Sequence, residues 1–341
     1  MNSFAANQNA IILHLRRKYT PAATRVVNLK AARRSDAATP RRRMLKSVDK
    51  ELSKGNYKTA IKIVKRMQGK PDGLCGFGVF KQVISRQSSL DELKFDEVDI
   101  SHLQRVVDSI LSLIIKSIHS PLEEEVSLGG NLLNYTIRLY FNKVALLNEL
   151  QRREDKDKSK GFSRTEESRT EWRVDREHLY ELSHRTCKQH EAGHFLVSYM
   201  LGVLPEKYEI PSVEVLSKKP TRGFVRIVNL QSPKEENGHE FSSKTLNKYS
   251  CIALAGLAAE YLEFEHIRGF ESDVNKLYDT LKWLGYTDAE AKSHMRWAVL
   301  NNVFILYRYR ATTTRLAEAM ASGMSIGLCI NTIEESLIEP I

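Results

Sequence analysis

Residues 188–197 read Lys-Gln-His-Glu-Ala-Gly-His-Phe-Leu-Val, and the two histidines in this stretch decide how the rest of the chain is interpreted. On a helix, residues four positions apart have Cβ atoms about 5–6 Å from each other, so the rings of His190 and His194 can reach one metal ion. Glu191 projects beside them, where a carboxylate can act as a general base on water at the metal. The stretch therefore predicts a catalytic metal-binding helix. The alternative is a chance match on an exposed helix.

The flanking sequence favours a helix at this place. No proline occurs between Leu179 and Leu201, and Val197 and Leu201 continue the stripe that begins with the histidines. Gly202, followed by Pro205, is a helix stop signal. We expect the metal-binding helix to end near Leu201.

The formal charge of +10 is concentrated at the start of the 341-residue chain. Residues 1–46 contain eleven Lys and Arg against one acid, whereas the remainder contains 41 of each sign. A basic, alanine-rich and acid-poor leader is typical of an organelle transit peptide, so residues 1–45 are assigned to a disordered transit peptide. A basic arm for nucleic acid is the alternative. We expect no nucleic-acid partner, because the excess charge lies in a removable segment.

Cysteine usage and hydropathy exclude two classes of protein. The four cysteines are widely scattered and form no Cys-x-x-Cys pair, which indicates neither a disulfide framework nor a thiolate zinc site. A reducing interior compartment fits this usage. No stretch approaches the roughly 18 consecutive apolar residues of a membrane span. We predict no transmembrane segment, which leaves peripheral association with a membrane open.

The chain is predicted to be mainly α (α+β), with an α-helical module over 46–151 in front of a second helical domain that contains the metal-binding helix. Two short helices are expected within 46–70, and longer ones from Ser101 to Pro121 and over 131–150. Residues 152–177 hold 17 charged residues of mixed sign in 26 positions. This composition is typical of a linker or an exposed helix, and we place the domain boundary there.

The second domain, 178–341, is predicted to be helical with a small β-hairpin. The alternating patterns of 212–216 and 224–228 predict its two strands. Such a hairpin could bind an extended substrate at its edge, or simply cover the core. Helices are expected from Ser243, near Phe270, from the capping box at Thr287, and from about Thr313 to Met320, after which Gly323 and Gly327 break the pattern.

A zinc hydrolase built on such a helix needs a third protein ligand and leaves a fourth position to water. No further histidine follows His194 at the spacing of an extended zinc motif. The candidates for the third ligand are Asp273, Glu260, Glu263, His239 and His266. Composition does not rank them.

Three segments together resemble the peptidase domain of the FtsH zinc metalloproteases. They are Thr-Cys-Lys-Gln-His-Glu-Ala-Gly-His-Phe at 186–195, Ala-Gly-Leu-Ala-Ala-Glu at 255–260, and Gly-Phe-Glu-Ser-Asp at 269–273. The resemblance covers roughly residues 180–285 and implies a Zn²⁺ site made of His190, His194 and Asp273, with Glu191 as the catalytic base. It also implies that Glu260 packs between helices or supports a ligand. The whole chain is similar to plant plastid FtsH-like proteins that lack the AAA+ ATPase.

The sequence departs from the FtsH pattern in ways that affect function. No Gly-x-x-x-x-Gly-Lys-Ser/Thr loop occurs, and Leu257 stands where the family usually has Arg. The resemblance thus implies a zinc-dependent metalloendopeptidase without its own ATPase, acting on polypeptide substrates that a separate AAA+ unfoldase or FtsH-type complex could prepare. It implies the chloroplast, with the mitochondrion as second choice, and permits an oligomer. The alternative is a catalytically silent scaffold or assembly factor of the plastid.

Overall fold

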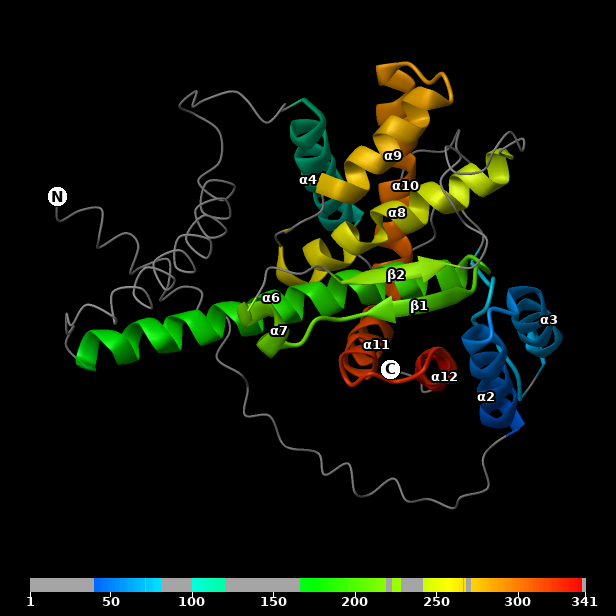
Figure 1. Ribbon diagram of the computed structural model, residues 1–341. Coiled ribbons are helices and arrows are strands. Elements are labelled where there is room, and N and C mark those ends of the chain that lie inside the picture. The colour runs from blue at the N-terminus through cyan, green and yellow to red at the C-terminus, as the bar shows by residue number, and fades with distance from the viewer. Residues whose placement is uncertain are drawn as a thin grey trace. The chain divides into compact units, whose positions relative to one another are not determined.

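The computed structural model describes residues 40–70, 72–80, 100–119, 166–218, 223–227, 242–265, 267 and 271–338. This part of the chain is mainly helical with one small antiparallel sheet of two strands, which confirms the predicted fold class (Figure 1). No helix within it is long and apolar enough to cross a membrane.

The predicted helix over 131–150 and residues 1–39 of the predicted transit peptide lie outside the described residues. The elements are α2 (Pro40–Ser53), α3 (Tyr57–Met67), α4 (Ile100–His119), α6 (Glu166–Met200), β1 (Pro205–Glu209), α7 (Val213–Lys218), β2 (Phe224–Ile227), α8 (Ser243–Phe264), α9 (Glu271–Trp283), α10 (Asp288–Arg308), α11 (Arg310–Ala321) and α12 (Ile326–Ile338).

Helix α6 carries the histidine pair and ends where the sequence predicted. Gly202 has a φ of +73°, a left-handed conformation that glycine adopts without a Cβ clash. The N–H of Gly202 donates to the carbonyl of Tyr199, and that of Val203 donates to the carbonyl of Ser198. These two bonds form a Schellman motif, which satisfies carbonyls left open at the helix end. The motif turns the chain directly into β1.

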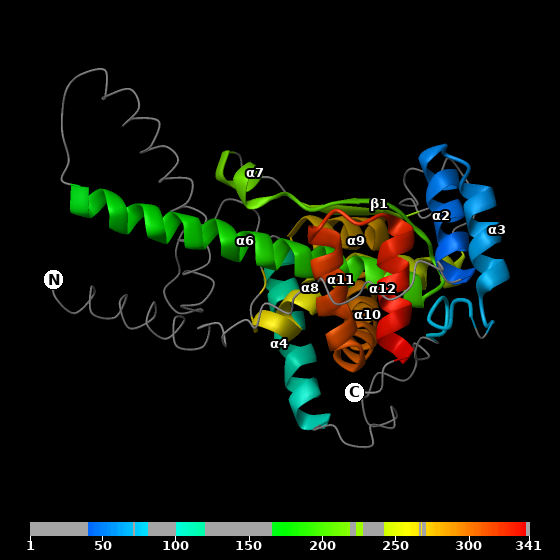
Figure 2. The ribbon, with the colours of Figure 1, turned by 90° about the horizontal axis from the view of Figure 1, so that it is seen from below.

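The C-terminal half of α6 is buried between other helices. Helix α8 packs along it, and α11 also packs against it (Figure 2). The approach of α8 is close at Gly193, where an added Cβ would lie 2.6 Å from the Cβ of Ala259. The small residues of α8 on this side, Ala255, Gly256, Ala258 and Ala259, are all buried. Close packing here fixes the histidines relative to α8.

The front helices share one hydrophobic core with the helices that follow. Leu45 of α2, Val64 of α3 and Ile110 of α4 belong to the same buried cluster as Phe195 of α6 and Leu300 of α10. Residues 40–341 form one compact unit. The described parts of the two regions that the sequence had led us to separate thus pack together, because the apolar faces of the front helices are buried against each other and against the later helices.

Two predicted segment boundaries change in the structure. Helix α2 begins at Pro40, so residues 40–45, which we had placed in the transit peptide, are helical, and Leu45 is buried. Helix α6 begins at Glu166, inside the charged segment assigned to a linker. Mixed charges at helical spacing are compatible with either state, since an exposed helix solvates them as well as a linker does.

The prediction of a strand over 212–216 was wrong. Residues Val213–Lys218 form the short helix α7, and the partner of β2 is instead β1, with Tyr208 opposite Val225 and Glu209 opposite Phe224. The Ser212 hydroxyl accepts a hydrogen bond from the N–H of Val215, and Glu214 pairs with Lys218 one turn on. This local capping favours a helix over the alternating pattern. Proline was compatible with β1 because it occupies the first position of the strand.

A final helix was also missed. We expected Gly323 and Gly327 to end regular structure, but α12 runs from Ile326 to Ile338 with Gly327 in its first turn. The Asp49 carboxylate of α2 accepts hydrogen bonds from the Ser325 hydroxyl and from the N–H of Gly327. A Cβ at Gly327 would lie 2.7 Å from the carbonyl oxygen of Leu45. The glycine therefore permits close contact with α2, which caps α12 from outside.

A buried carboxylate on α12 ties the front of the chain to α6. Glu334 is fully buried and accepts hydrogen bonds from the backbone N–H groups of Cys75 and Gly76 and from the hydroxyl of Tyr199. The neighbouring backbone N–H of Gly78 donates to the carbonyl of Tyr199 at the end of α6. The loop over 72–80 is thus held against the end of the helix that bears the histidines.

Replacing Glu334 by alanine is expected to lower the free energy of unfolding by about 3 kcal/mol, because three donors, two of them buried, lose a charged acceptor. Urea unfolding followed by circular dichroism measures this change. The control is Glu335→Ala, which removes a half-exposed ion pair with Arg42 and one hydrogen bond from Asn331 and should cost about 1 kcal/mol. Equal losses for the two variants would contradict the role of Glu334.

Candidate metal centre

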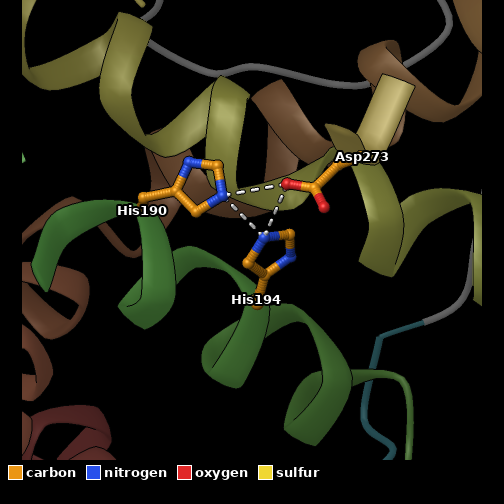
Figure 3. Close-up of side chains that lie close together, drawn as sticks. All are labelled: His190, His194 and Asp273. Carbon is orange, nitrogen blue, oxygen red and sulfur yellow. Dashed lines mark hydrogen bonds and ion pairs between the residues drawn. The ribbon is translucent and has the colours of Figure 1, made fainter. Parts of the chain in front are cut away.

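Three side chains from two helices meet at one point. His190 and His194 come from α6, and Asp273 comes from the first turn of α9 (Figure 3). The Nε2 atoms of the two histidines are 2.9 Å apart. Oδ2 of Asp273 lies 3.1 Å from Nε2 of His190 and 3.7 Å from Nε2 of His194. The predicted metal ligands are therefore brought together, although 83 positions separate the first from the last.

The second nitrogen of each ring is already engaged. Nδ1 of His190 lies 2.6 Å from Oε1 of Glu260, which is buried on α8. Nδ1 of His194 lies 2.7 Å from the backbone carbonyl oxygen of Ile252, also on α8. A carbonyl oxygen and a carboxylate only accept, so both Nδ1 atoms must carry the proton. In neutral rings both Nε2 atoms then present lone pairs, and these face each other and the Asp273 carboxylate.

Such a meeting of three acceptors is unfavourable unless a cation lies between them. Tetrahedral zinc with ligand bonds of about 2.0–2.2 Å holds neighbouring donor atoms about 3.3 Å apart. The observed separations of 2.9, 3.1 and 3.7 Å bracket that value. Two imidazoles and one carboxylate are also a donor set that zinc prefers, with a fourth position left for water. The residues present fit a catalytic zinc ion.

The pKa shifts of the cluster reflect the carboxylates that surround His190. Burial acts to lower the pKa of His190, but the hydrogen bonds to Asp273 and Glu260 outweigh it and raise that pKa well above its ordinary value. Burial acts to raise the pKa of Asp273, but the two imidazoles beside its carboxylate lower that pKa below its ordinary value. The raised pKa of His190 and the lowered pKa of Asp273 both mean that the site favours a positive charge at its centre.

Glu191 lies beside this centre, and no described residue holds its carboxylate. Its side chain is buried, and its carboxylate makes no hydrogen bond to any residue that the structure describes. Burial raises the pKa of Glu191, which the nearby His190 and His194 partly offset. A buried carboxylate with free acceptor atoms and a raised pKa suits a group that takes up and releases a proton.

The start of β2 lies against this carboxylate. A Cβ at Gly223 would lie 2.8 Å from Cγ of Glu191 and 2.9 Å from Sγ of Cys187. Burial raises the pKa of Cys187 to about 12, so this neighbour remains a neutral thiol. The glycine thus lets a strand approach the proposed base closely. No motif in the sequence indicates this contact, because Gly223 is 32 positions away from Glu191.

The other candidates for the third ligand separate clearly in the structure. Glu260 contacts Nδ1 of His190 on the side away from the cluster, in the supporting position that the family resemblance implied. Glu263 accepts a hydrogen bond from Arg310 and is not part of the cluster. His239 and His266 lie outside the described residues. Among the described residues Asp273 therefore completes the site.

The absence of a side chain at Gly256 lets α8 lie directly against the ring of His190. A Cβ at this position would overlap the ring of His190, which lies flush against the helix backbone. The ring thus packs on α8 through Gly256 and bonds to α8 through Glu260. The side chain has little freedom to leave the position in which its Nε2 faces the cluster.

Comparison of the sequence with protein-family models and with curated proteins finds no match. The resemblance to FtsH peptidases therefore rests on the quoted motifs, and membership of that family remains a prediction.

Replacing Glu260 by glutamine is expected to weaken zinc binding by about tenfold or more, because a neutral amide supports the donor character of His190 less well than a carboxylate. Competition with a chromophoric zinc chelator measures the affinity. Glu263→Gln is the control, since it lies one turn further along α8 and is bonded to Arg310 instead. Unchanged affinity in Glu260→Gln would contradict a supporting role for Glu260.

Proposed function

We propose that the protein is a zinc-dependent metalloendopeptidase. The observation that carries the proposal is the convergence of Nε2 of His190, Nε2 of His194 and Oδ2 of Asp273, with the unbonded Glu191 carboxylate beside them. A zinc ion bound there would supply Lewis acidity, which lowers the pKa of water and polarises a carbonyl group.

Each residue has a separate task in the proposed reaction. His190, His194 and Asp273 would hold the ion, while Glu260 and the carbonyl of Ile252 keep both rings in the tautomer that offers Nε2. Glu191 would accept a proton from the attacking water and pass it to the nitrogen of the leaving amine. Water attack on the carbonyl carbon and cleavage of the C–N bond then consume one water and release two peptide ends.

The position of the small sheet is an argument for a polypeptide as the substrate. Within the described residues β2 pairs with β1 on one side only, and its start lies at Glu191. An extended segment added to the free edge of β2 would be held by backbone hydrogen bonds close to the base. Only an unfolded or flexible segment could be bound in this way, which fits a peptidase that receives substrates prepared by a separate unfoldase.

The test is cleavage of an unstructured protein such as casein by the full chain, together with its zinc content. We expect one zinc per chain, loss of cleavage after chelation, and recovery when zinc is restored. A chain that binds one zinc and cleaves neither casein nor a library of unstructured peptides would instead support the scaffold alternative. A chain that binds no zinc would contradict both.

A further inference from the structure

The helical hairpin of α2 and α3 carries most of the net charge of the protein. Residues 40–70 contain eleven Lys and Arg and two acids, a formal charge of +9 out of +10 for the whole chain. The hairpin is part of the compact unit, and α2 packs on both α3 and α12 (Figure 1). The positive charge of this protein is thus not confined to the leader but extends onto a folded surface.

The hairpin uses only a few of its charges to attach itself to the body. Arg41 donates to Asn331, Arg42 pairs with Glu335, and Asp49 caps α12. The other acid, Glu51, pairs with Lys54 and accepts from Asn56 within the hairpin. Both acids are therefore committed to local contacts and do not neutralise the outer face.

The outer face, which we call the basic face, presents seven exposed cations. None of them forms an ion pair with any residue that the structure describes. They are Lys46, Lys50, Lys58, Lys62, Lys65, Arg66 and Lys70.

The basic face continues onto the start of α8. Burial lowers the pKa of Lys248, and the positive charges of Lys244 and of Lys65 on α3 lower it further, so these lysines lie close to one another. Like charges gathered in excess of acids raise the free energy of the isolated protein, and a negatively charged partner would relieve that cost.

We propose that the basic face docks the protein on the surface of an anionic membrane. Six of its seven cations are lysines, which act as point charges toward phosphate and lack the planar fork with which arginine reads bases. Tyr57 is the one aromatic residue in 40–70, and its hydroxyl donates to Glu206, so the hairpin offers no platform for stacking bases. Met44 is 38 % exposed among these cations, and apolar side chains between lysines are typical of helices that lie at a membrane interface. This inference is independent of the proposed hydrolysis.

Sedimentation of the full chain with lipid vesicles tests the proposal. We expect binding to phosphatidylcholine vesicles that contain phosphatidylglycerol, little binding to phosphatidylcholine alone, and release at high salt. Lys58→Glu combined with Lys62→Glu should weaken binding by about thirtyfold or more. The control combines Lys116→Glu of α4 with Lys276→Glu of α9, two exposed lysines outside the hairpin that form no ion pair with a described residue, and it changes the net charge equally. It should stay within about twofold of the wild type, because screening limits the reach of surface charge to about 10 Å.

Three outcomes would overturn the proposal. Equal weakening in both double variants would show that net charge alone drives binding. Unchanged binding in the hairpin variant would assign it to other residues. Duplex DNA binding that the hairpin variant loses, with vesicle binding unaffected, would identify nucleic acid as the partner. Circular dichroism of both variants verifies that each is folded, since every substituted side chain is exposed.

Discussion

Glu191→Gln is expected to slow cleavage of an unstructured polypeptide by about 10²–10⁴-fold, the contribution typical of a general acid–base group. Glutamine has nearly the same shape as glutamate, but its amide cannot accept a proton from water. The carboxylate makes no hydrogen bond to a described residue, so the substitution should leave the packing of α6 intact. Zinc content should stay at one per chain, because the ligand atoms belong to other residues.

Single-turnover cleavage of a fluorescent casein derivative measures this loss, with zinc content and thermal unfolding measured on the same samples. Glu263→Gln serves as the matched control, since it makes the same chemical change at a residue bonded to Arg310. The control should retain full activity. Cleavage by Glu191→Gln at more than a tenth of the wild-type rate would exclude Glu191 as the base, whatever the metal content.

Asp273→Ala is expected to abolish stoichiometric zinc binding and, with it, cleavage. Removing the carboxylate leaves two imidazoles from one helix, and zinc sites of this kind need three protein ligands. The side chain of Asp273 is about one-quarter exposed, at 27 %, so its removal creates little buried cavity. Loss of zinc would thus report on coordination and not on a collapse of the core.

Zinc content after gel filtration, together with titration by a chromophoric chelator, measures the effect. Glu263→Ala is the appropriate control, because sequence alone made Glu263 an equal candidate for the third ligand and the structure places it outside the cluster. Full zinc content in Asp273→Ala would contradict the proposed site. Zinc loss in Glu263→Ala would mean that the candidates had been assigned the wrong way round.

Local signals in the sequence were sufficient for most of the helices. The Thr287 capping box, the Gly202 stop and the apolar stripe after Ser101 each depend on residues within a few positions, and the structure has α10, the end of α6 and α4 at these places. The fold class followed from the same signals. Strand assignment failed at 212–216 because the capping contacts of Ser212 and the pair of Glu214 with Lys218 are also local, and they opposed the alternating pattern.

Contacts between segments far apart in the sequence could not be predicted from such local patterns. Gly327 looked like a helix breaker until Asp49, 278 positions away, was found capping the helix that contains it. Glu334 gave no sign of being fully buried, because its partners are backbone groups of a loop near residue 75 and the hydroxyl of Tyr199. In both cases the stabilising contact forms only when segments far apart in the sequence have packed together.

The same division applies to the candidate metal centre. The sequence by itself determined that His190 and His194 share one helical face with Glu191 beside them, because the four-residue spacing of the histidines and the lack of proline set this geometry. Resemblance pointed to Asp273, but residues alone left Glu260 and Glu263 as equals. Only the tertiary structure decided between them, through the packing of α8 on α6 at Gly193 and Gly256 and the placement of α9. The physical reason is that a carboxylate can bind a metal ion only if it lies next to the other ligands. Asp273 is 83 positions from His190, so whether the two lie together depends on how the helices pack.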